Sequence, residues 1–125
     1  MAARKSKKTR KIPAPVVHFE IQGKNAKKSV AFYASLFNWK IQYLPEMSYG
    51  MVDAGGPLKG KINGGIASAK KPFATFYAAV PDINATLAQV KKMGGKVTLP
   101  RTEIPGVTMA MFKDPDGISI GLVEG

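Results

Sequence analysis

The chain has 125 residues, of which 45% are apolar and 22% charged, and its formal net charge is +11. These values are typical of one globular domain that is long enough to bury a single core. The absence of cysteine excludes disulfides, thiolate catalysis and zinc sites built on cysteine. No apolar run reaches the roughly 18 residues of a membrane span. No signal-peptide pattern follows the basic N-terminus, so we expect a cytoplasmic protein.

The first fifteen residues are strongly basic and contain no acid. Their positive charges are those of Arg4, Lys5, Lys7, Lys8, Arg10 and Lys11. Such a segment buries too little apolar surface to offset its ordering entropy, so residues 1–15 are expected to be a disordered tail. We expect the tail chiefly to aid solubility. Weak, nonspecific contact with nucleic acid or an anionic surface is the alternative, because lysine and arginine bind phosphates without reading bases.

The first half of the remaining chain begins with an alternating strand at residues 16–22, which places His18 and Glu20 on the same face. Asn25 is a suitable N-cap for a helix that runs to about Phe37, with apolar residues at helical spacing. Short strands are then predicted at residues 39–43, 49–52 and 62–67. A flexible loop rich in glycine separates the last two strands.

The same order of elements returns at an offset of about 56 residues. A strand at residues 73–80 precedes Asp82, a good N-cap, and the helix that follows runs to about Met93, before two glycines. A strand at residues 96–99 and a loop at residues 100–106 come next. The second half is therefore expected to repeat the fold of the first.

The last two apolar runs, residues 107–112 and 118–123, flank the sequence Asp114-Pro115-Asp116-Gly117. Aspartate, proline and glycine in this order predict a tight turn, and hence a β-hairpin. With the hairpin, each half reads β-α-β-β-β.

The repeat predicts one domain, residues 16–125, with module one at about 16–68 and module two at about 72–124, after the tail at 1–15. We expect an α+β fold in which the paired β-α-β-β-β modules form an open, curved half-barrel sheet with a concave ligand cleft. The aromatic residues are expected chiefly in the core, and those that face the concavity would stack on a flat ligand. They include Trp39, Tyr43, Tyr49, Phe73 and Tyr77.

Short motifs along residues 16–124 follow the order and spacing of a known family. They are Val17-His18-Phe19-Glu20-Ile21, Phe37-Asn38-Trp39-Lys40-Ile41, Ile62-Asn63-Gly64-Gly65-Ile66, Val80-Pro81-Asp82-Ile83, Gly94-Gly95-Lys96-Val97 and Phe112-Lys113-Asp114-Pro115-Asp116-Gly117. In these residues the chain resembles the glyoxalase / bleomycin-resistance / extradiol-dioxygenase superfamily, also called vicinal oxygen chelate proteins, as a glyoxalase-like single-domain member. The resemblance implies a homodimer and, in many members, a divalent metal inside each half-barrel.

The family's metal ligands come from the first strand, the strand opening the second module and the last strand. By the resemblance these positions fall on His18, Thr75 and Gly121. Threonine is a poor ligand and glycine has no side chain, so we expect the metal site to be degenerate and no cofactor to be bound. A divalent metal in a rearranged site that includes Glu20 or Tyr77 is the alternative.

The expected ligand-binding residues are His18, Glu20, Thr75, Tyr77, Met109 and Met111. Metal-free members of the family bind drugs and aromatic molecules, so the resemblance implies a protein that binds a small apolar or aromatic compound. Glu20 is open to two interpretations, a general base or a structural ion pair, and no catalytic residue is assigned. The alternative is a divalent-metal-dependent lyase, isomerase or dioxygenase of the same superfamily. A second alternative is an interaction module that binds nucleic acid through the basic tail.

Overall fold

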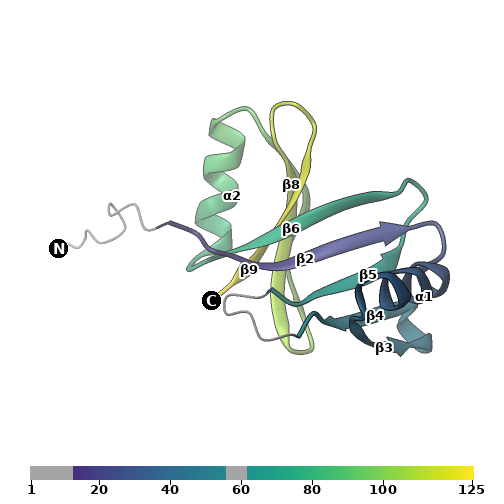
Figure 1. The fold of residues 1–125 in the computed structure, drawn as a ribbon. Helices are drawn as coiled ribbons and strands as arrows, with labels where there is room; N and C mark the ends of the chain where they lie inside the picture. The colour runs from purple at the N-terminus through teal and green to yellow at the C-terminus, as the bar shows by residue number, and fades with distance from the viewer. Residues whose placement is uncertain (1–12, 56–61) are drawn as a thin grey trace.

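The computed structural model describes residues 13–55 and 62–125. Within these ranges the strands form one sheet of eight, in the order β3-β4-β5-β2-β6-β9-β8-β7 (Figure 1). The strands are β2 (Val16–Gly23), β3 (Lys40–Leu44), β4 (Tyr49–Asp53), β5 (Gly64–Ser68), β6 (Phe73–Val80), β7 (Lys96–Ile104), β8 (Val107–Lys113) and β9 (Ser119–Glu124). The helices are α1 (Ala26–Phe37), α2 (Ile83–Lys92) and a short 3₁₀ turn, η2 (Pro45–Met47).

The two halves of the sheet have the same connectivity. The first half is β2-α1-β3-β4-β5 and the second is β6-α2-β7-β8-β9. β2 pairs parallel to β5, β6 pairs parallel to β9, and the antiparallel pairing of β2 with β6 joins the halves. This architecture, α+β with an open sheet, confirms the fold class expected from the repeat.

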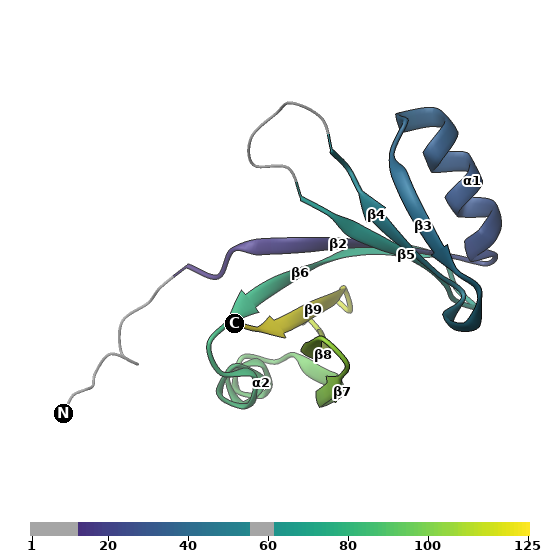
Figure 2. The ribbon, with the colours of Figure 1, turned by 90° about the horizontal axis from the view of Figure 1, so that it is seen from below.

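Each helix packs on its own half of the sheet, α1 against β3, β4 and β5 and α2 against β7, β8 and β9 (Figure 2). The core is accordingly divided into two clusters. One is built around Ile66 with Ala26 and Val52, and the other around Ile83 with Leu87. None of the helices in the described part of the chain is both long and apolar enough to cross a membrane.

The predicted helix starts and the predicted turn are confirmed. The side chain of Asn25 accepts a hydrogen bond from the Lys28 amide, and that of Asp82 accepts one from the Ala85 amide, each at 3.0 Å. At the turn before β9, Asp114 Oδ1 accepts hydrogen bonds from the amides of residues 116 and 118, each at 2.9 Å. These side chains satisfy backbone donors that have no partner within the helix or ladder.

The loop predicted at residues 100–106 is wrong for its first five residues, because β7 continues to Ile104. The pairing of β7 with β8 shifts register between Val97 and Leu99 and again between Leu99 and Thr102. β7 is the last strand of the sheet. An edge strand tolerates a proline such as Pro100, since irregular pairing absorbs the missing amide.

The disordered tail predicted for residues 1–15 lies mostly on residues 1–12, outside the described residues. From Pro13 onward the chain is described, and the carbonyl of Pro15 accepts a hydrogen bond from the Ala79 amide at 2.9 Å. Contact with the sheet therefore starts one residue before β2.

Candidate functional site

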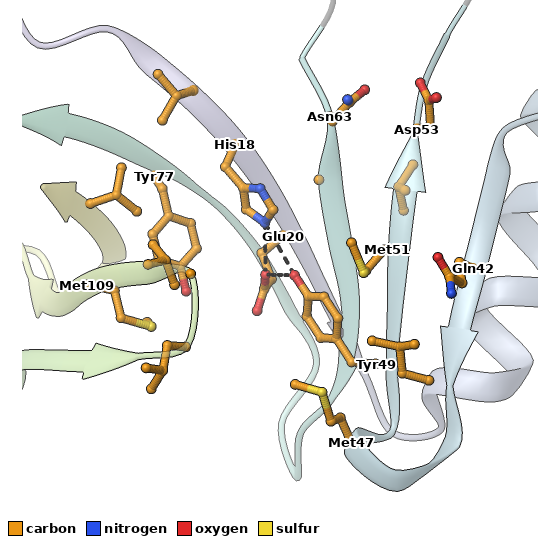
Figure 3. Close-up of a pocket in the computed structure, with 18 of the residues that line it drawn as sticks. His18, Glu20, Gln42, Met47, Tyr49, Met51, Asp53, Asn63, Tyr77 and Met109 are labelled. Atoms are coloured by element: carbon orange, nitrogen blue, oxygen red, sulfur yellow. Dashed lines mark hydrogen bonds and ion pairs between the residues drawn. The ribbon is translucent and has the colours of Figure 1, made fainter. Parts of the chain in front are cut away.

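The face of the sheet opposite the helices is hollowed by a cavity of about 1100 Å³ (Figure 3). Residues of all eight strands line it, with the β7–β8 connection at its rim. Most of the lining is apolar and includes Val17, Ile41, Leu44, Met47, Met51, Val107 and Met109. A volume of this order matches the clefts that bind small organic molecules.

Glu20 lies at the floor of this cavity and is only 7% exposed. Alternation along β2 directs Phe19 and Ile21 into the core under α1 and Glu20 to the opposite face. One carboxylate oxygen, Oε1, accepts a hydrogen bond from the Tyr49 hydroxyl at 3.0 Å, and the other, Oε2, accepts one from Gln22 Nε2 at 3.0 Å. Glu20 is the only buried polar or charged residue found within the described ranges.

His18 completes this group, which we call the Glu20 cluster: His18, Glu20, Gln22 and Tyr49. His18 Nε2 lies 3.3 Å from Glu20 Oε1 and 3.3 Å from the Tyr49 oxygen. Figure 3 shows the imidazole and the phenol converging on the carboxylate. A carboxylate with a donor on each oxygen and an imidazole nitrogen beside it is held in one orientation, which is the state that ligand binding requires.

Two tyrosines near Glu20 resist ionisation. Burial, and then the charge of Glu20 and its hydrogen bond, raise the pKa of Tyr49 well above the ordinary value for a phenol. Burial, followed by the charge of Glu20, raises the pKa of Tyr77 to about 12. Both hydroxyls are therefore protonated at neutral pH and act as donors, that of Tyr77 to Met111 Sδ at 3.4 Å.

The same two tyrosines cover two glycines of the sheet. Tyr77 is the direct partner of Gly121 in the β6–β9 pairing, and a Cβ built at Gly121 would overlap the ring of Tyr77. A Cβ at Gly65 on β5 would overlap the ring and hydroxyl of Tyr49. Only glycine permits so close an approach of a ring to the strand.

Four of the six predicted ligand-binding residues line the cavity. They are His18, Glu20, Tyr77 and Met109. Thr75 and Met111 are not among its lining residues. The Thr75 hydroxyl donates to the Ser119 carbonyl at 2.7 Å, and Met111 Sδ accepts the hydrogen bond of the Tyr77 hydroxyl. Of the predicted polar residues, the structure thus places three in the cavity lining and leaves Thr75 outside it.

Sequence reasoning did not assign β4 and the turn before it to the site. Tyr49, Met51 and Met47 line the cavity from these elements, and Tyr49 bonds directly to Glu20. The sequence pattern places Tyr49 only among the aromatic residues expected chiefly in the core. The alternation that places residues 49 and 51 on one face was a usable signal. The position of Tyr49 over Gly65 could not be predicted, because it depends on the pairing of β4 with β5 and not on the local sequence.

The residues present do not fit a divalent metal at the family's ligand positions. His18 is a possible ligand, but the Thr75 hydroxyl is committed to a carbonyl and Gly121 offers no donor. The ring of Tyr77 fills the space that a side chain at Gly121 would need. Within residues 13–55 and 62–125, no group of three or more His, Cys, Asp or Glu side chains is placed to hold a metal ion.

Comparison with known proteins identifies the family. Residues 16–122 match the family model described as Glyoxalase/Bleomycin resistance protein/Dioxygenase superfamily. Proteins named "Putative glyoxylase CFP32" from Mycobacterium bovis and Mycobacterium tuberculosis are each 29% identical over 111 residues. These alignments cover 82% of this chain but only 42% of each relative, so the chain spans less than half the length of the curated relatives it matches.

Solved structures share the fold at low sequence identity. A protein of Bacillus halodurans C-125 has a TM-score of 0.65 at 14% identity, covering 91% of this chain and 96% of its own. A superfamily member from Vibrio splendidus 12B01 has 0.61 at 17% identity, covering 90% and 98%. A methylmalonyl-CoA epimerase variant of Streptomyces coelicolor, in complex with 2-nitronate-propionyl-CoA, has 0.62 at 15% identity, covering 90% and 94%. With fold, repeat and family model in agreement, the chain belongs to the Glyoxalase/Bleomycin resistance protein/Dioxygenase superfamily.

Proposed function

We propose that this protein binds a small, largely apolar or aromatic compound in the cleft, without a divalent metal. The cavity supports this proposal because its walls are mostly apolar and its polar groups are few and convergent, as in small-molecule sites generally. His18, Glu20 and Tyr77 are the polar groups we expect the ligand to contact. We expect no direct contact between the ligand and Thr75 or Met111, because these two residues are not part of the cavity lining.

The observation that carries the proposal is the ring of Tyr77 lying against Gly121. In metal-containing relatives, by the resemblance, the last strand supplies a carboxylate at this position. Here the position has no side chain, and an aromatic ring takes up the space above it. An aromatic surface that can contact an organic ligand therefore stands where the resemblance places a metal ligand.

The methionines of the cleft suit a ligand of irregular shape. Met47, Met51 and Met109 contribute unbranched, polarizable side chains from different elements. Such side chains adapt to a bound surface and make favourable contacts with aromatic rings. Tyr49 and Tyr77 add flat surfaces on which a ring can stack.

The test is an unbiased determination of ligands and metals on protein purified without chelators. We expect an organic molecule, or an empty cleft that takes up a neutral naphthalene probe, and metal well below one ion per chain. A Met109→Trp variant fills the cleft and is expected to abolish probe binding. The matched control is Met93→Trp, at a methionine that is 72% exposed and outside the cavity. A stoichiometric divalent ion bound through His18 would overturn the proposal.

An enzymatic alternative is favoured by the Glu20 cluster, in which an imidazole, a carboxylate and a phenol share hydrogen bonds. Such groups can hold or move a proton. The alternative is a divalent-metal-dependent lyase, isomerase or dioxygenase of the superfamily. The solved structures that resemble this chain in fold include a methylmalonyl-CoA epimerase. Absence of turnover of 2-oxoaldehydes, thiol adducts and catechols with added nickel, zinc, manganese or iron would exclude it.

The homodimer and the cytoplasmic location remain proposals, the former because members of the family are often dimers. Sedimentation of the full chain tests the dimer.

Nucleic-acid binding by the basic tail is the second alternative. The basic residues of the tail lie outside the described residues. Deleting residues 1–12 and measuring duplex binding over a salt series tests it, because phosphate contacts weaken as salt rises.

A further inference from the structure

The carboxylate of Glu20 has hydrogen-bond donors around it but no permanent cation. Tyr49 and Gln22 are neutral donors, and within the described ranges neither a lysine nor an arginine forms an ion pair with Glu20. His18 is a cation only when protonated. Tyr49 donates to one oxygen of the carboxyl group and Gln22 to the other, so that both oxygens act as acceptors. A buried negative charge without a full counter-charge favours the arrival of a cation.

The other charged residues of the cleft lining are less buried than Glu20. Glu124 is bound by Arg101, whose Nη2 lies 2.7 Å from its Oε1. Lys40 and Asp53 lie opposite each other in the antiparallel pairing of β3 with β4, and both are exposed. The buried carboxylate of the cleft is therefore that of Glu20.

The surroundings of Glu20 also suit a positive group. The rings of Tyr49 and Tyr77 lie on either side of it in Figure 3, with Met109 and Met47 beyond them. The faces of aromatic rings attract organic cations, most strongly where water is excluded. The imidazole of His18 packs edge-on against Tyr77, with the ring centroids 5.4 Å apart. This contact helps to fix the orientation of the Tyr77 ring.

We propose that the cleft selects organic cations, namely apolar or aromatic molecules that carry a protonated amine, and that the amine pairs with Glu20. This inference rests on the proposed function, because it names the class of compound that the apolar cleft takes. The apolar part of the ligand lies against the methionines, and its ammonium group donates to the carboxylate of Glu20.

The test compares three probes of one shape by calorimetry: 1-naphthylmethylamine, 1-naphthalenemethanol and 1-naphthoate. The wild-type chain is expected to bind the amine at least about tenfold more tightly than the alcohol, as a charge-assisted hydrogen bond predicts, and to bind the naphthoate most weakly. Glu20→Gln keeps an acceptor for Tyr49 and is expected to remove the preference for the amine over the alcohol. Glu103→Gln, at an exposed carboxylate, is the matched control.

Equal affinities of the wild-type chain for amine and alcohol would overturn the inference and leave the proposed function standing. A preference for the naphthoate would do the same. Failure of all three probes to bind would overturn both. The wild-type comparison does not depend on any variant folding, and a thermal melt of Glu20→Gln establishes whether the variant arm is interpretable.

Discussion

Tyr77 and Gly121 face each other across the β6–β9 pairing, and the ring of Tyr77 occupies the space that a side chain at Gly121 would take. One contact thus couples two features of the site. The ring fills the space at the position where the resemblance places the last metal ligand. The contact also places a phenol near Glu20, and burial, followed by the charge of Glu20, raises the pKa of Tyr77 to about 12.

Gly121→Ala is expected to destabilise the fold by about 1–3 kcal/mol, the usual cost of overpacking a closely packed position. The added methyl group has to displace the ring of Tyr77. The free energy of unfolding in urea measures the effect. In a Tyr77→Ala background the same substitution should cost much less, because the ring is absent. Equal costs in the two backgrounds would mean that the ring is not what excludes a side chain from position 121.

The second prediction concerns restoring a metal site. Thr75→His with Gly121→Glu supplies the two missing ligand types, but the glutamate would overlap Tyr77. The double variant is therefore expected to gain no affinity for zinc or nickel, whereas adding Tyr77→Ala should create it. Calorimetric titration of folded protein measures this, and His18→Ala in the triple variant is the control. Metal binding by the double variant would show that the ring of Tyr77 does not block the site, and absence of binding by the triple variant would show that the ligand positions are placed wrongly.

Local chemistry in the sequence was enough to predict much of this fold. Asn25 and Asp82 are N-caps as predicted, and Asp114 organises the turn before β9. Alternation along β2 correctly placed His18 and Glu20 together. These features depend on residues within a few positions of one another, where backbone preferences decide the outcome.

Features set by distant strands could not be predicted in the same way. The Thr75 hydroxyl bonds to Ser119, 44 residues away, so a residue predicted to line the cleft is committed to the sheet. Tyr49 reaches Glu20 from a strand 29 residues later. Pro100 suggested a loop, yet an edge strand with irregular pairing accommodates it. Each outcome depends on cross-strand register, which local periodicity does not give.

The third prediction concerns alkaline pH. The pKa of Tyr77 rises on folding from an ordinary value near 10 to about 12, so the folded state holds the phenolic proton more tightly. The resulting stability is complete below about pH 10 and is lost as the pH rises toward about 12. Tyr77→Phe removes this contribution and should flatten the decline, as measured by urea unfolding across that range. Parallel declines in the variant and the wild type would contradict the assignment.

The fourth prediction concerns the turn that sets the register of β9. Asp114→Ala removes an acceptor of two backbone hydrogen bonds, each 2.9 Å long, and is expected to destabilise the fold by about 1–2 kcal/mol. Asp116→Ala is the matched control, since only its amide takes part in these bonds. Thermal unfolding compares the two. Because β9 carries Gly121 into place under Tyr77, the Asp114 variant should also bind the naphthalene probe less tightly. Indistinguishable variants would mean that proline and glycine alone fix the turn.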